Sequence, residues 1–398
     1  MYDLIIIGGG IIGLATGYRW LEQHPGSRLL LLEKEDQVGQ HQSGHNSGVI
    51  HSGLYYRPGS RKAQTCRAGV KALRSFCDQQ GIPYQRCGKV VVATSTEELP
   101  RLQQLYERGQ ANGVAHLQMV GSEELRELEP HVRGLQGLVV PSTGIVDFTQ
   151  VTRRLQKLII NLGGQIHCGA EVLKIYSRTR AVQVVSSAGE FITHRVINCG
   201  GLYADELVRK AGSISGVRII PFRGEYYVLR NQARHLVKNL IYPVPDPSFP
   251  FLGVHFTRRM DGTIEAGPNA VLALAREGYT KTDFHARELQ RTLTFPGTWR
   301  LFAKYWRTGL AEQWRSLVKG AFVKALQRLI PELQKLDLRP GGSGVRAQAL
   351  DINGRLLNDF HVEVHGQVIH VLNTPSPGAT SSLAIGQWIV NLVEEIED

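Results

Sequence analysis

The chain opens with an apolar run that leads directly into a glycine-rich turn. Residues 2–7 are almost continuously apolar and rich in isoleucine, which is typical of a strand buried in a parallel sheet. Glycines follow within residues 8–13, and residues 14–23 have a helical pattern. A second apolar run at residues 29–32 ends at Glu33. The order strand, turn, helix, strand predicts a right-handed βαβ unit.

The alternation of polar and apolar positions predicts further elements along the rest of the chain. Helical patterns recur at residues 62–80, 97–112, 151–162, 296–330 and 382–396. Strand-like patterns recur at residues 89–93, 165–175, 182–186, 191–198 and 217–256. The glycines within Gly341–Gly344 are expected to open the final segment of the chain.

The first turn carries the glycine spacing of a dinucleotide-binding site. Gly8 permits the tight turn, Gly10 lets a pyrophosphate approach the backbone, and Gly13 lets the helix pack closely on the strand. The N-terminal end of that helix would face the phosphates. Glu33 lies at the end of the second strand, where a carboxylate accepts hydrogen bonds from ribose hydroxyls. These positions predict a bound dinucleotide, and they fit NAD and FAD equally.

The order of elements predicts two interleaved domains, which suits a chain of 398 residues. One is an α/β Rossmann-type dinucleotide-binding domain assembled from residues 1–80, 149–216 and 339–398. The other is an inserted α+β substrate domain with an antiparallel sheet, assembled from residues 81–148 and 217–338 and including the basic helical segment 296–330.

Composition and charge narrow the class of protein only slightly. The net charge of +11 suits an anionic ligand, an anionic membrane surface or nucleic acid. We expect no nucleic-acid partner, because no motif interleaves aromatic and basic residues in the required way. The five cysteines include no CxxC pair, and the chain shows no secretory leader and no run of about 20 apolar residues. We therefore expect a cytoplasmic protein with reduced thiols.

Several longer strings carry a resemblance to a known family. They are HNSGVIHSGLYYRPGS, CGKVVVA, PFRGEYY, GGSGVRAQ and PSPGATSSLAIG, and they follow one another in order over nearly the whole chain. They resemble the L-2-hydroxyglutarate dehydrogenases, FAD-dependent enzymes of the D-amino-acid-oxidase-like superfamily. The resemblance implies a Rossmann-type FAD-binding domain, FAD as cofactor, and oxidation of a dicarboxylate, L-2-hydroxyglutarate, to 2-oxoglutarate. It also implies that electrons pass to a quinone or another acceptor.

The resemblance also implies which further residues contact FAD. Ser43, His45, Asn46 and Ser47 would lie along the pyrophosphate and ribityl chain, and Val172 would meet the adenine through its backbone. Gly200 and Gly201 would form a second glycine pair. The segment formed by Pro377, Gly378, Ala379, Thr380 and Ser381 would bring backbone N–H groups to the pyrimidine end of the flavin, where reduction places negative charge.

Oxidation of a secondary alcohol needs a base for the hydroxyl proton, and histidine suits that role near neutral pH. His51 is the first candidate because it lies in the loop that the resemblance places beside the flavin, and His255 is the second. His51 has a rival role, because related flavoenzymes attach FAD covalently through a histidine in this region. We expect no metal site, since no carboxylate cluster accompanies His45 and His51.

A dicarboxylate substrate needs two cationic anchors, and arginine binds a carboxylate with two hydrogen bonds. Arg346 resembles the arginine that binds the substrate carboxylate in this superfamily. Arg223 is a candidate for either carboxylate, and Arg57 or Arg258 for the other. Tyr226 is a candidate for lining the substrate pocket, although a strand tyrosine also serves packing.

Two alternatives to this function stay open. An FAD-dependent dehydrogenase or oxidase of glycerol 3-phosphate, another 2-hydroxy acid or an amino acid would share the cofactor residues and differ in the inserted domain. A non-catalytic flavin- or RNA-binding protein is a remoter alternative, suggested only by the net charge of +11.

The basic helical segment 296–330 contains three of the five tryptophans and carries a net charge of +6. Its apolar stripe changes phase beyond Gly309 and Gly320, which predicts two helical pieces. Basic helices with tryptophan at the apolar boundary bind anionic lipid surfaces. The segment therefore favours a peripheral position on the cytoplasmic face of the inner membrane, where a quinone is available. The alternative is a helix packed on the substrate domain with a solvated basic side.

Overall fold

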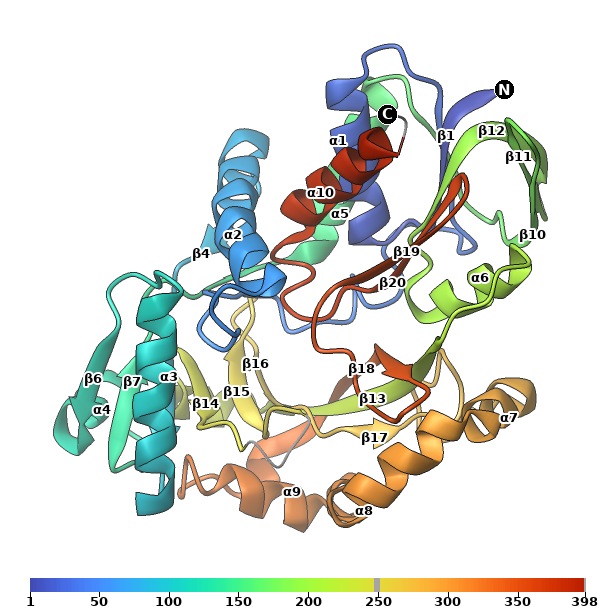
Figure 1. The fold of residues 1–398 in the computed structure, drawn as a ribbon. Coiled ribbons are helices and arrows are strands. Elements are labelled where there is room, and N and C mark those ends of the chain that lie inside the picture. Colours follow the sequence, from blue (N-terminus) through green and yellow to red (C-terminus); the bar gives the residue numbers. More distant parts are fainter. Residues whose placement is uncertain (247–250, 397–398) are drawn as a thin grey trace.

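The computed structural model describes residues 1–246 and 251–396, which form two large sheets joined through a shared cavity (Figure 1). The first sheet has eight strands, and its parallel centre pairs β12 with β1, β1 with β2, and β2 with β9. Its strands are β1 (Tyr2–Ile7), β2 (Leu29–Leu32), β9 (Gln165–His167), β10 (Val172–Ser177), β11 (Val182–Ser186), β12 (Gly189–Asn198), β19 (His361–His365) and β20 (Val368–Asn373).

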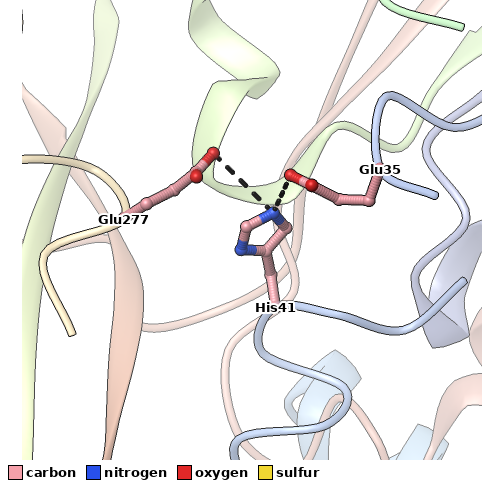
Figure 2. A group of neighbouring side chains, drawn as sticks. All are labelled: Glu35, His41 and Glu277. Carbon is pink, nitrogen blue, oxygen red and sulfur yellow. Dashed lines mark hydrogen bonds and ion pairs between the residues drawn. The ribbon is translucent and has the colours of Figure 1, made fainter. Parts of the chain in front are cut away.

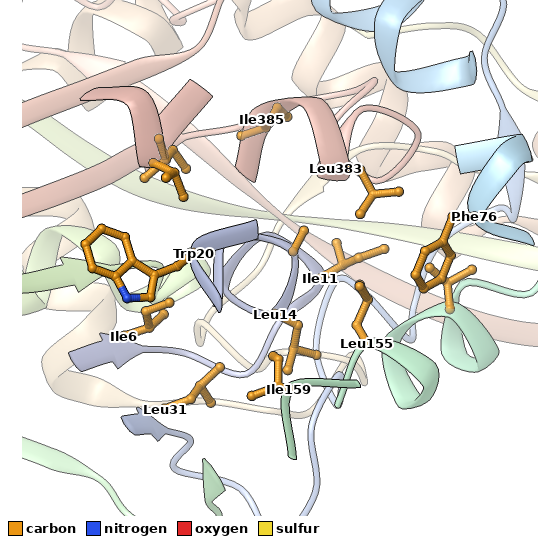
Figure 3. Close-up of a cluster of buried hydrophobic side chains, with 14 of the residues drawn as sticks. Ile6, Ile11, Leu14, Trp20, Leu31, Phe76, Leu155, Ile159, Leu383 and Ile385 are labelled. Carbon is orange, nitrogen blue, oxygen red and sulfur yellow. The ribbon is translucent and has the colours of Figure 1, made fainter. Parts of the chain in front are cut away.

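Helices pack on one face of this sheet because its central strands are apolar on both faces. They are α1 (Ile11–Gln23), α2 (Arg61–Gln80), α5 (Phe148–Asn161) and α10 (Ser382–Glu395). Figure 3 shows the core between them, in which Ile6 and Leu31 of the sheet meet Leu14, Leu155 and Ile385 of the helices. α6 (Ala204–Lys210) is on the other side, where Leu207 packs on the sheet. The core fixes where the turn between β1 and α1 lies.

The second sheet has nine strands and is largely antiparallel, with the order β17-β13-β16-β15-β14-β5-β7-β6 and β18 paired to β13. Its strands are β5 (Lys89–Ala93), β6 (Gln118–Gly121), β7 (Gln136–Val139), β13 (Val217–Leu229), β14 (Leu240–Pro243), β15 (His255–Arg258), β16 (Ile264–Gly267), β17 (Val271–Leu272) and β18 (Leu338–Asp351). A small third sheet joins β3 (Val49–Ile50), β8 (Gly144–Val146) and β4 (Tyr84–Gln85).

Further helices accompany the nine-stranded sheet. They are α3 (Leu99–Ala111), α4 (Ser122–Leu128), α7 (Ala286–Thr294), α8 (Pro296–Leu317) and α9 (Lys319–Leu326). Short 3₁₀ turns occur at η1 (Thr96–Glu98), η2 (Gly201–Tyr203), η3 (Asn231–Leu236) and η4 (Lys335–Asp337). Figure 1 shows α8 and α9 on the side of this sheet that faces away from the eight-stranded sheet.

Three details differ from the sequence predictions. Residues 165–175 form parts of two strands, β9 and β10, rather than one. The basic helical segment forms two helices, as predicted, but they meet at Val318, and Gly309 lies inside α8 rather than at the break.

The glycines of Gly341–Gly344 lie within β18 and do not open a separate segment. β18 pairs with β13 over nearly its whole length. The glycines of β18 let neighbouring backbone come close to this strand. A Cβ at Gly341 would lie 2.9 Å from the Tyr226 carbonyl oxygen, and one at Gly344 would lie 2.6 Å from that of His45. We propose the same two interleaved domains, with the last boundary moved from residue 338 to beyond Asp351.

Candidate active site

A cavity of about 1590 Å³ lies between the two large sheets and collects most of the predicted site residues. The eight-stranded sheet contributes the turn after β1 and Glu33 at the end of β2. The nine-stranded sheet contributes Tyr226, His255 and Arg346, and the loop before β3 adds residues 45–47. The site therefore exists only where the two sheets meet.

The three glycines of the turn have different structural roles. Gly8 has a φ of 110°, a backbone conformation that favours glycine. A Cβ at Gly13 would overlap the carbonyl oxygen of Gly8, so this glycine is required by the packing of α1 on β1. A Cβ at Gly10 would point into open space, with Ser43 Oγ at 3.5 Å as its nearest neighbour. Gly10 alone therefore keeps space free for a ligand.

The acidic residue at the end of β2 is oriented by the same turn. Glu33 is 7% exposed, lines the cavity, and accepts hydrogen bonds from the backbone N–H groups of Gly9 at 2.6 Å and Glu35 at 2.9 Å. An ionised carboxylate has room for further hydrogen bonds beyond these two. Ribose hydroxyl groups entering the cavity would find this acceptor already in position.

The loop of residues 43–47 lies along the cavity and is stabilised by its own side chains. Ser43 Oγ accepts the N–H of Ile11 at 2.9 Å, at the start of α1. Asn46 donates to the Ser43 carbonyl at 2.7 Å and accepts the N–H of Gly48 at 2.9 Å. The ring of His45 rests 4.5 Å from that of Tyr279. Asn46 and His45 thus position the loop, and Ser43 through Ser47, apart from Gly44, line the cavity.

The predicted adenine and second glycine positions also line the cavity. Val172 begins β10, and its carbonyl oxygen accepts a hydrogen bond from Lys210 Nζ at 2.7 Å. The backbone N–H of Gly200 donates a hydrogen bond to Asn198 Oδ1 at 3.0 Å, and Gly201 has a φ of 52°. Val172, Gly200 and Gly201 therefore line the same cavity as Glu33.

The loop before α10 reaches the cavity, but only some of its predicted cofactor-binding residues line it. Gly378, Ala379 and Thr380 line the cavity, whereas Pro377 and Ser381 are buried beside it, so the cavity lining supports contact with FAD only for the first three. Ser381 instead packs on α2. Thr380 Oγ1 accepts the backbone N–H of His51 at 3.1 Å, which ties this loop to the candidate base.

The two candidate bases lie in the same cavity and are both neutral near pH 7. Burial, with the nearby charge of Lys89, lowers the pKa of His51 to about 3, and burial lowers the pKa of His255 to about 4. His51 Nε2 lies 3.2 Å from Ser376 Oγ. His255 Nδ1 donates to the Gly253 carbonyl at 2.9 Å, which leaves Nε2 unprotonated and able to accept a proton.

The candidate arginines are in different environments. Arg346 is open to the cavity, its guanidinium lies 5.2 Å from the Phe251 ring centre, and burial lowers its pKa. Arg57 also lines the cavity and is exposed. Arg223 pairs with Glu225 at 3.0 Å, which already neutralises its charge.

Arg258 is placed outside the site. Its guanidinium donates to the Lys238 carbonyl at 3.2 Å, and the residue does not line the cavity. The reason is strand geometry: side chains alternate between the two faces, so His255 and Arg258, three positions apart on β15, point to opposite sides. We therefore drop Arg258 as a substrate anchor, and Arg223 is retained only as a lining residue.

The sequence analysis missed two lysines. Lys62 lines the cavity, and burial lowers its pKa to about 8. Lys89 is 2% exposed, rests between the rings of Tyr55 and Tyr242 at 4.4 and 5.0 Å, and burial lowers its pKa to about 7. The sequence contained a signal for Lys89, because this lysine begins the apolar strand KVVVA and buried lysines are rare. Tyr226 lines the cavity as predicted, and burial raises its pKa to about 12.

A separate cluster of charged side chains lies near the Glu33 end of the cavity. Figure 2 shows His41 between Glu35 and Glu277. Its Nε2 lies 2.8 Å from Glu35 Oε1 and 3.7 Å from Glu277 Oε1, and a group of this kind could also hold a metal ion. Lys34, however, already pairs with both glutamates, and the Tyr203 hydroxyl donates to Glu277 at 2.7 Å. These contacts satisfy the carboxylates as an ion-pair network, which links the end of β2 to the loop after β17.

The cavity and its glycine turn define the class of protein. A family model described as FAD dependent oxidoreductase matches residues 3–392. The chain belongs to this family, and FAD is its cofactor. L-α-glycerophosphate oxidase from Mycoplasma pneumoniae, solved with FAD bound, has a TM-score of 0.82 at 24% identity over 99% of this chain and 94% of that chain. This similarity confirms the predicted fold class.

Sequence relatives narrow the class further. The chain is 51% identical to L-2-hydroxyglutarate dehydrogenase of Indibacter alkaliphilus over 97% of each chain. It is 46% identical to L-2-hydroxyglutarate dehydrogenase of Escherichia coli strain K12 over 100% of this chain and 94% of the relative. It therefore belongs with the L-2-hydroxyglutarate dehydrogenases, as the sequence strings indicated. It is an enzyme with a small-molecule substrate and an electron acceptor, and not a binding module without catalysis.

Proposed function

We propose that this chain oxidises L-2-hydroxyglutarate to 2-oxoglutarate. The observation that carries the proposal is one cavity that contains the dinucleotide turn, two neutral histidines and Arg346, which has no carboxylate partner among the described residues. The alcohol loses its hydroxyl proton and a hydride from C2, and so becomes a ketone. FAD, when bound, supplies the hydride acceptor at N5.

The residues of the chain have separate roles in this reaction. Arg346 holds the carboxylate next to C2, because a guanidinium matches a carboxylate with two hydrogen bonds. We infer that His51 takes the hydroxyl proton, since it is unprotonated at neutral pH and its backbone is tied to the loop before α10. His255 is the second candidate. Tyr226 contributes to the pocket wall and helps to exclude water.

Anaerobic mixing of the purified holoenzyme with single substrates tests this function. L-2-hydroxyglutarate should bleach the flavin absorbance. D-2-hydroxyglutarate should be poor, because inversion at C2 turns the hydride away from the flavin when both carboxylates are anchored. Glycerol 3-phosphate, monocarboxylic 2-hydroxy acids and amino acids serve as comparisons. Faster bleaching by one of these than by L-2-hydroxyglutarate would show that a neighbouring substrate is the correct one.

We further propose that a quinone accepts the electrons and that α8 docks the protein on an anionic membrane surface. The apolar stripe of α8 points away from the protein, with exposed fractions of 59% for Trp299, 55% for Trp306, 61% for Trp314 and 65% for Leu317. The opposite side of the helix is buried through Leu301, which packs on the nine-stranded sheet, and through polar residues such as Ser316. The helix is packed on the substrate domain, as the alternative expects, while its tryptophan stripe faces outward, and this outward stripe supports the docking proposal. In residues 1–246 and 251–396, no helix is long and apolar enough to cross a membrane.

Basic side chains accompany the exposed stripe, which suits anionic lipids. Each cation close to an anionic surface contributes about 1 kcal/mol to binding, and α8 carries Arg300, Lys304 and Arg307, whereas its Arg315 pairs with Glu312. Docking of this face would hold the enzyme on the cytoplasmic face of the inner membrane, near a bilayer-soluble quinone.

Flotation with anionic vesicles at low salt should carry the protein upward, and high salt should weaken this binding. Trp306→Glu should abolish flotation, because it removes apolar area and adds repulsion. Ile192→Glu is a matched control, since Ile192 is 50% exposed on the eight-stranded sheet. Absence of flotation by the unmodified protein at both salt concentrations would rule out the membrane role.

A further inference from the structure

The cavity contains more positive charge than Arg346 alone supplies. Three of the cations that line it already have a carboxylate partner: Lys34 pairs with Glu277, Lys210 with Glu171, and Arg223 with Glu225. Among the described lining residues, Arg57, Lys62 and Arg346 have none. An unpaired cation in a partly buried site is costly, which indicates that an anion completes its environment.

Lys62 is the better placed of the two cations that accompany Arg346. It lies in the first turn of α2 and is partly buried, whereas Arg57 is exposed. Its Nζ lies 5.2 Å from the ring centre of Tyr56, another lining residue. Burial lowers the pKa of His51 most, and the charges of Lys89, His255, Lys62 and Arg346 lower it further. Burial also lowers the pKa of Lys62, the carboxylate of Asp359, another lining residue, raises it, and the charge of Arg346 lowers it. Both cations therefore lie near the candidate base.

The start of α2 adds to this positive potential. Ser60 caps the helix by accepting the N–H of Ala63 at 3.3 Å, and Gly59, Ser60 and Lys62 all line the cavity. The N-terminal end of this 20-residue helix therefore faces the cavity with its partial positive charge. α2 and β18 thus bring two cationic centres to the same space from elements far apart in sequence.

We propose that Lys62 binds the second carboxylate of the substrate, so that Lys62 and Arg346 together select a dicarboxylate over a monocarboxylate. This inference rests on the proposed function, because L-2-hydroxyglutarate carries carboxylates at both ends of a five-carbon chain. One carboxylate meets the guanidinium of Arg346 next to the reacting carbon, and the other meets the ammonium of Lys62. A substrate without the second carboxylate leaves Lys62 unpaired, which opposes its binding.

The test is an equilibrium titration of the oxidised holoenzyme, followed by the change in flavin absorbance, with 2-oxoglutarate and with 2-oxobutyrate. The wild type should bind 2-oxoglutarate more tightly. Lys62→Met should weaken 2-oxoglutarate binding by about 10²-fold, as expected for a lost charge pair, and should leave 2-oxobutyrate binding nearly unchanged. Lys62→Arg should restore most of the preference. Lys71→Met is the matched control, because Lys71 is exposed on the same helix.

Three results would overturn the assignment. The first is Lys62→Met binding 2-oxoglutarate like the wild type, the second is loss of both ligands to an equal extent, and the third is a preference that persists in Lys62→Met and disappears in Arg57→Met. The proposed function is tested separately, since it fails if L-2-hydroxyglutarate does not reduce the wild-type flavin. Reduction of the wild-type flavin with an unchanged preference in Lys62→Met contradicts the role of Lys62 alone.

Discussion

Replacing His51 with alanine should leave FAD bound and slow reduction of the flavin by L-2-hydroxyglutarate by about 10²–10⁴-fold, the range typical of a lost general base. The imidazole lines the cavity with Arg346, and burial together with the Lys89 charge keeps its pKa at about 3. A depressed pKa leaves the ring unprotonated, so it can accept the substrate proton throughout the neutral range.

The same depressed pKa determines the pH dependence of the wild type. Below its pKa a histidine is protonated and cannot act as a base. Because the pKa of His51 is about 3 rather than the ordinary 6.5, kcat/KM should stay level from about pH 7 down to about pH 5. A fall centred near pH 6.5 would contradict this assignment, since it would indicate a base with an unperturbed pKa.

Two further variants make the assignment of the base decisive. His194→Ala is the control, because His194 is exposed on β12 and lies outside the cavity lining. If His51→Ala is reduced at the wild-type rate and His255→Ala is not, His255 is the base. If denatured wild type retains its flavin and denatured His51→Ala releases it, the role of His51 is covalent attachment.

Replacing Gly10 with valine should yield a folded protein that has lost essentially all of its FAD. The protein leaves room for the new side chain, since the nearest atom to a Cβ at Gly10 is Ser43 Oγ at 3.5 Å. That room is the space in which the glycine turn brings the pyrophosphate to the N-terminal end of α1. Flavin absorbance per protein molecule gives the occupancy, and circular dichroism reports the fold.

Two other glycines separate loss of cofactor from loss of fold. Gly216→Val should keep FAD, because a Cβ at Gly216 meets no atom within 4 Å and its backbone suits any residue. Gly13→Val should destabilise the protein itself, since its side chain would overlap the Gly8 carbonyl and separate α1 from β1. A Gly10→Val protein that is fully occupied by FAD would show that the pyrophosphate lies elsewhere.

Some errors in the predicted site were avoidable from strand periodicity. Arg223 and Glu225 are two positions apart on β13, so their side chains share a face and can pair. His255 and Arg258 are three positions apart on β15 and face opposite sides. The spacing of these residues was visible in the sequence. The strand-like pattern at residues 217–256, however, did not show where the individual strands begin and end.

The sequence by itself determined the dinucleotide turn, its flanking strands and helix, Glu33 and the family, because these depend on local spacing and on continuous strings of residues. Only the tertiary structure decided which cations lack a partner, that β18 completes the nine-stranded sheet, and that the tryptophans of α8 face outward. Lys62 and Arg346 lie on α2 and β18, which are distant in the chain, and their approach to His51 depends on the packing of the two sheets. Burial and pairing are properties of such long-range contacts, and no local pattern of residues encodes them.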